Sequence, residues 1–140
     1  MLTRYKLIAA LLFVTTFLGL TAFGIDYNGG DEALLTWGNV KAESSKITNV
    51  KQAEIIDALA KPIAITIGGK EAQIERATVN VFPLSTDPKL IYLVGGAFSA
   101  EAQAELQATV GWGTKIFFEE AVCTLKGKPK KIATITLKVM

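Results

Sequence analysis

The chain has no histidine and only one cysteine among its 140 residues. Ser-His-Asp and Cys-His catalysis both need an imidazole, so neither can be built within this chain. Zinc sites that contain histidine are excluded for the same reason, and a lone Cys123 cannot form an intrachain disulfide. We therefore expect no catalytic residues, no metal site and no cofactor, and we predict that the protein is not an enzyme.

An excess of charge is also missing from most of the chain. Arg4 and Lys6 precede a long charge-free run, and the remaining 13 basic residues are matched by 13 acidic ones. Proteins that bind nucleic acid normally carry a basic excess, because they must neutralise phosphates. The balance therefore indicates that nucleic acid is not a partner.

The feature that the chain does have is an apolar run from Leu7 to Ile25. As an α-helix, this run would span roughly 28 Å, which is close to the thickness of a bilayer core. Basic residues precede the run and Asp26 ends it, so the positive-inside rule places the N-terminus in the cytoplasm. We predict a transmembrane anchor at residues 1–25, inserted in a bacterial inner membrane, with the remainder of the chain in the periplasm.

A secretory signal peptide is the alternative interpretation of the same segment. Residues 1–6 are basic, and Ala22-Phe23-Gly24 has the small-x-small pattern of a cleavage site. The run is longer than a usual signal-peptide core, which favours the anchor. Cleavage near Gly24 would instead release a secreted protein, and both alternatives lead to the same compartment.

One side of the predicted anchor is suited to helix packing. Leu11, Thr15, Gly19 and Ala22 recur at helical spacing, and small residues let a second helix approach closely within a membrane. The anchor would contact the lipid bilayer through residues 7–25, and this face would contact a partner helix, including that of a second copy of the protein.

Residues 26–48 are predicted to form an irregular linker, since Tyr27 to Asp31 is rich in turn residues and Trp37-Gly38-Asn39 interrupts the pattern again. Trp37 would then be available to contact the membrane or a neighbouring subunit. A β domain is predicted to follow at residues 49–140. It begins with a short helix over 49–61, capped by Thr48 or Asn49 and ended by Pro62.

From Pro62 onward, apolar residues alternate with a period of two, which is typical of half-buried strands. Strands are predicted at residues 62–67, 72–82, 89–94, 115–125 and 131–139, with a helix at 100–109 capped by Ser99 and a hairpin turn at 127–130. The fold class is therefore mainly β. We expect one N-terminal transmembrane helix followed by a small antiparallel, immunoglobulin-like β-sandwich with one or two short helices.

Two further features bear on interactions and on chemistry. Trp112 lies between Gly111 and Gly113, where its ring either anchors a partner or folds over the core. An enzyme without histidine would have to gather carboxylates in a deep pocket, and the candidate residues for such a pocket are Asp57, Glu71, Glu75, Asp87, Glu119 and Glu120.

The second half of the chain resembles a known family. The stretch from Leu93 to Val139 combines a helix start, a glycine-led strand, a hairpin and an alternating last strand, at Gly96, Ser99, Leu106, Gly113, Lys115, Phe118, Glu119, Gly127, Lys130, Ile135, Leu137 and Val139. This order is similar to that in the C-terminal β domain of GldM, a gliding-motility and type IX secretion protein of Bacteroidota. Members of that family are much longer.

The resemblance implies an exported, non-enzymatic module that binds other envelope proteins. Together with the predicted anchor, it leads us to expect a membrane-anchored protein whose periplasmic β domain binds partner subunits of a secretion, motility or other membrane complex. The alternative is a soluble β-domain binding protein that is secreted after cleavage near Gly24.

Overall fold

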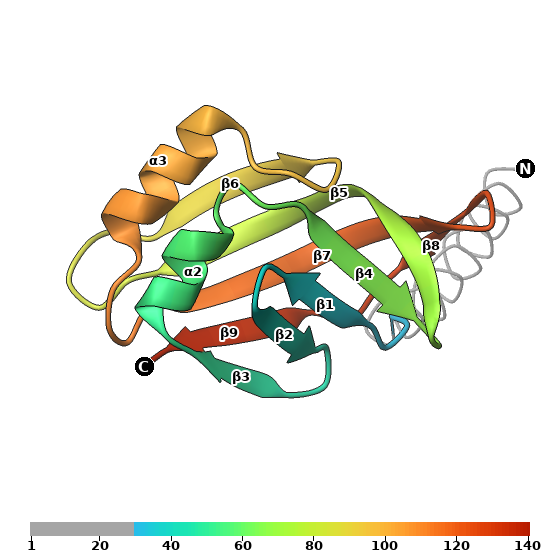
Figure 1. The fold of residues 1–140 in the computed structure, drawn as a ribbon, viewed down its shortest axis with the longest axis horizontal. Coiled ribbons are helices and arrows are strands. Elements are labelled where there is room, and N and C mark those ends of the chain that lie inside the picture. Colours follow the sequence, from blue (N-terminus) through green and yellow to red (C-terminus); the bar gives the residue numbers. More distant parts are fainter. Residues whose placement is uncertain (1–29) are drawn as a thin grey trace, which may run out of the picture.

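The computed structural model describes residues 30–140, which form a mainly β domain with two short helices (Figure 1). The strands are β1 (Leu34–Trp37), β2 (Val40–Glu43), β3 (Ile47–Val50), β4 (Ile63–Ile67), β5 (Lys70–Phe82), β6 (Lys89–Val94), β7 (Lys115–Leu125), β8 (Lys128–Lys131) and β9 (Ile135–Val139). The helices are α2 (Gln52–Ala58) and α3 (Ala100–Thr109). The predicted anchor and its helix-packing face lie outside the described residues. Within residues 30–140, no helix is both long and apolar enough to cross a bilayer.

The strands form one mixed sheet, which curls into a nearly closed barrel. Its path runs β2-β1-β4-β5-β7-β9-β3, with β6 added beside β5 and β8 beside β7. All pairs along this path are antiparallel except β3–β9, which is parallel. β2 and β3 at the two ends of the path lie close together in Figure 1. The expected antiparallel sandwich is thus replaced by a barrel, because β3 pairs with the last strand and brings the sheet round.

The long central strands are formed where the sequence alternates. In β5, the inward positions Ala77, Val79 and Val81 are buried, and β7 and β9 supply Ile116, Phe118, Ile135 and Leu137 to the same interior. Both predicted helices are present. Ser99 caps α3 by accepting a hydrogen bond from the Ala102 N–H at 3.2 Å, and α2 is shorter than predicted, with Lys51 rather than Thr48 or Asn49 at its N-cap.

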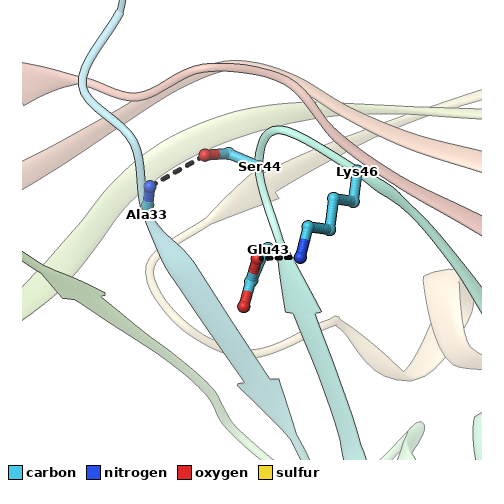
Figure 2. A network of polar contacts seen from close by, with 4 residues as sticks. All are labelled: Ala33, Glu43, Ser44 and Lys46. Atoms are coloured by element: carbon cyan, nitrogen blue, oxygen red, sulfur yellow. Dashed lines mark hydrogen bonds and ion pairs between the residues drawn. The ribbon is translucent and has the colours of Figure 1, made fainter.

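The predicted linker at residues 26–48 is wrong from residue 34 onward, because three strands begin between residues 34 and 47. β1 pairs with β2 and with β4, so it is an interior strand of the barrel. The Ala33 N–H donates to Ser44 Oγ at 2.9 Å, and the Ser44 N–H donates to the Ala33 carbonyl oxygen at 3.0 Å, which extends the β1–β2 ladder. Figure 2 shows the first of these bonds and the exposed Glu43–Lys46 ion pair in the turn beyond it.

The last predicted strand, 131–139, is observed only over residues 135–139, as β9, and the predicted hairpin turn at 127–130 is wrong because β8 occupies residues 128–131. β8 pairs with the C-terminal half of β7, and β9 pairs with its N-terminal half. Between them, Ile132 is buried and forms a parallel bridge with Asp31, whose carbonyl oxygen accepts a bond from the Ala133 N–H at 2.9 Å. The incoming chain at Asp31 therefore occupies the position beside Ile132 where a continuous strand was expected.

Candidate functional site

The two tryptophans that sequence reasoning singled out have opposite surroundings. Trp37 is fully buried, with its ring 5.4 Å from that of Phe98 and 6.1 Å from that of Phe118 between centroids. The prediction that it contacts a membrane or a subunit is therefore wrong, because β1 carries it into the core. Trp112 is 73% exposed on the loop that follows α3, so its ring does not fold over the core.

The main exposed apolar surface lies on β6. Leu90, Tyr92 and Val94 point outward and are 51%, 73% and 80% exposed, while Ile91 and Leu93 between them are buried. We call these three outward side chains the β6 surface. Three consecutive outward positions of one strand are thus apolar or aromatic, and exposed apolar residues that occur together, rather than singly, are typical of interaction sites.

β5, which pairs with β6, and β7, which lies beyond β5, give this surface a mixed border. Asn80 on β5 lies opposite Leu90, and its side-chain amide donates to Glu119 Oε2 on β7 at 2.9 Å. Next along the sheet, the rings of Phe82 and Phe117 meet edge to face with centroids 5.5 Å apart. The β6 surface is therefore apolar along the outermost strand and becomes polar toward the middle of the sheet, with an aromatic pair at one end.

A hollow of about 520 Å³ opens beside Tyr92 and Val94, and its remaining lining includes Arg76, Glu120, Val122 and Lys131. It lies where the β5–β7 register shifts around Arg76, near Glu120, which has a positive φ of 50°. Such a bulge re-aims side chains and bends the strand. The hollow is thus lined by basic and acidic residues on one side and by the apolar β6 surface on the other.

The outer edge of β6 is unpaired. β5 is the only strand of residues 30–140 that pairs with β6, so within this part of the chain no strand lies on the other side of Lys89 to Val94. β8 provides a contrast, since its sequence Lys128-Pro129-Lys130-Lys131 carries the charges and the proline that discourage edge pairing. Residues 90–94 of β6 have neither.

A second exposed region lies at one end of the barrel. Leu84, 67% exposed, packs against Gly113 in the loop that carries Trp112. The Gly113 N–H donates to the Val139 carbonyl oxygen, whereas Ile132, beside Asp31, donates to Ala121 farther along β7. At about 3.3 Å per residue, the Trp112 loop and Asp31 are roughly 25 Å apart along the barrel.

The carboxylates that were considered for a pocket do not share one hollow in residues 30–140. No cluster of three or more Asp, Glu or Cys side chains there could hold a metal ion. Of the carboxylates considered for a pocket, Glu120 lines the hollow beside Tyr92 and Glu71 lines a separate one near β4. Cys123 is fully buried, and burial raises the pKa of its thiol from 9.0 to about 11, with a further rise from the Glu75 carboxylate.

The β6 surface was not found from the sequence, although a signal was present. The segment Lys89-Leu-Ile-Tyr-Leu-Val94 is apolar at five consecutive positions, whereas β5 and β9 alternate. An uninterrupted apolar run predicts a strand covered on both faces. Because the described chain covers only one face of β6, the other face is left exposed.

Comparison with known proteins adds no relative. No protein-family model, no curated protein and no solved structure matches this chain.

Proposed function

We propose that this protein is a non-catalytic, membrane-anchored envelope protein whose periplasmic β domain binds partner proteins. The observation that carries the proposal is the β6 surface, where Leu90, Tyr92 and Val94 are exposed along a strand with an unpaired edge. Such an edge offers main-chain hydrogen bonds for affinity and outward side chains for specificity. The neutral charge balance and the absence of histidine support recognition rather than chemistry.

The arrangement of the domain fits an anchor at residues 1–25. The described chain enters the barrel beside Ile132, while Trp112 and Leu84 lie near the far end of β7. A domain held at Asp31 would therefore present its Trp112 end away from the membrane. The β6 surface, on the side of the barrel, would remain accessible to neighbouring proteins.

The resemblance of residues 93–139 to the GldM β domain supports an envelope partner, within a secretion or motility complex or a similar assembly. In this proposal, the face formed by Leu11, Thr15, Gly19 and Ala22 packs against a second transmembrane helix. The anchor then raises the local concentration of the β domain beside its partners.

The anchor is tested by fractionating bacterial cells that produce the full chain. We expect the protein in the inner membrane, extractable by detergent but not by salt, with an N-terminal sequence that starts at Met1. A matched chain that carries a cleavable signal before Asp26 should be released with the periplasmic contents. A mature protein that starts at Ile25 would instead support the secreted alternative.

The binding surface is tested by placing a photo-crosslinking amino acid at Tyr92 and, as a control, at Ile47 on β3. Both side chains are well exposed, at 73% and 63%. We expect discrete protein adducts only from position 92. Equal crosslinking from both positions, or none from position 92, would contradict the proposal that β6 binds a partner.

A further inference from the structure

We infer that β6 pairs with β6 of a second copy of this chain, in antiparallel orientation about a two-fold axis at Tyr92. The inference rests on the proposed function, since it names the partner of the β6 surface. A two-fold interface uses the same patch on both copies, so the patch must be complementary to itself.

Side-chain direction limits the registers that two copies can adopt. In an antiparallel pair, directly opposed residues point to the same face of the sheet. Leu90, Tyr92 and Val94 face outward and Ile91 and Leu93 face inward. The two-fold axis must therefore pass through a residue of β6 rather than between two residues.

Among the registers that remain, an axis at Tyr92 uses the whole strand. It sets Tyr92 against its own copy, Leu90 against Val94 and Ile91 against Leu93, and Lys89 falls opposite Gly95. An axis at Ile91 would place Pro88 within the ladder, where it cannot donate a hydrogen bond. An axis at Leu93 would replace half of the ladder with Gly95 and Gly96.

The Tyr92-centred register is also free of charge conflict. Its outer row contains only Leu, Tyr and Val, which are favourable cross-strand neighbours. The one charged residue of the strand, Lys89, meets a glycine and keeps Glu105 of its own copy at 3.9 Å. A charged partner strand would find no opposite charge along this row. A second copy supplies an apolar row of the same length.

The area involved indicates how strong the pairing is. Three side chains of these sizes and exposures offer on the order of 200–300 Å² per copy. A stable interface buries about 800 Å² per partner. The pair is therefore weak when the domain is free, and it forms when both copies are held in one membrane, which raises their effective concentration.

The register is tested by disulfide crosslinking of the full chain in bacterial inner membranes, with Cys123→Ala in every variant so that only introduced thiols react. Tyr92→Cys should form a disulfide-linked dimer on mild oxidation, since its thiol faces its own copy. Val94→Cys is the matched control. Val94 is at least as exposed as Tyr92, but in this register it lies about 13 Å from its own copy, so the variant should stay monomeric.

Co-production of Leu90→Cys and Val94→Cys chains should give the mixed dimer, because these positions are opposed. Adding Tyr92→Lys to both chains should lower the yield of this mixed dimer by about fivefold or more, because two positive charges then meet at the two-fold axis. Ile47→Lys, remote from β6 in the sheet order, should leave it unchanged.

The inference is overturned if Tyr92→Cys stays monomeric, or if Val94→Cys crosslinks as readily as Tyr92→Cys. The proposed function can survive that result. A photo-crosslinker at position 92 that captures a different envelope protein, and never a second copy, would retain the binding role of β6 and exclude self-pairing.

Discussion

The aromatic side chains of this domain divide into a buried group and an exposed group with different roles. Trp37 joins Phe98 and Phe118 in the interior, where tilted and edge-to-face contacts add to the burial of their surfaces. Tyr92 and Trp112 are each 73% exposed and contribute little to the core. Substitutions in the first group should therefore affect folding, and those in the second group should affect binding.

Replacing Trp37 with alanine should destabilise the domain by about 3–5 kcal/mol, because it leaves a large cavity. Trp37→Phe should reduce the stability by less than half as much. The indole N–H is buried without a hydrogen-bond partner in residues 30–140, so no hydrogen bond is lost when it is removed. Urea unfolding of chain 26–140, followed by circular dichroism, measures both. Equal losses of unfolding free energy in the two variants would show that the volume of the ring does not determine its contribution to stability.

The raised pKa of Cys123 predicts a pH-dependent stability term. The folded thiol keeps its proton up to about pH 11, whereas the unfolded thiol loses it near pH 9. The folded state binds more protons between these values, so stability falls as the pH rises through this window. The stability difference between the native protein and Cys123→Ala should shrink from pH 8 to pH 11. A difference that stays constant would contradict the raised pKa.

At the scale of elements, the strand edges have contrasting chemistry. β8 is protected by three lysines and Pro129, whereas β6 exposes apolar residues beside an unpaired edge. Proteins generally avoid an unprotected apolar edge, because it recruits other strands. The two edges therefore differ in how strongly they discourage pairing with another strand, and this difference is what the proposed binding role of β6 uses.

Helix α3 begins with a side-chain cap at Ser99. Ser99→Ala removes the oxygen that accepts the Ala102 N–H and should cost about 1 kcal/mol. Ser99→Asp keeps an acceptor at the same position and should restore most of that loss. Thermal unfolding of the three proteins tests this, and equal melting temperatures for native protein and Ser99→Ala would contradict the cap.

How far each element could be predicted follows from the range of the interactions that form it. Alternation and capping are local, so β5, β7 and α3 were predicted close to their observed bounds. β1 and β2 are four residues each, too short for a period to stand out, and Gly38 interrupts them with a positive φ of 59°. β1 pairs with β4 as well as with β2, and β4 comes later in the chain.

At the scale of the whole molecule, the pairing of β3 with β9 determines that the sheet forms a nearly closed barrel. β3 and β9 pair in parallel, so residues near both ends of the described chain must meet before the sheet closes. Val50 and Val139 lie opposite each other there, and both are buried. The segment once expected to be a linker is therefore part of the fold.

Two truncations test this directly. A chain that starts at Asp26 should unfold cooperatively in urea, because it keeps β1, β2 and β3. A chain that starts at Asn49 should not fold, since it loses Leu35, Trp37 and Val40 from the core. Circular dichroism and a urea transition distinguish the two, and a cooperative transition in the shorter chain would show that the first strands are dispensable.

The sequence by itself determined the mainly β class, the two helices, the long strands and the exclusion of histidine-based chemistry, because composition, periodicity and caps are properties of neighbouring residues. The tertiary structure decided three other matters: the parallel closure that makes a barrel rather than a sandwich, the burial of Trp37, and the exposure of Tyr92. Each depends on which distant segment lies alongside, and the apolar residues of a strand do not specify which segment that is.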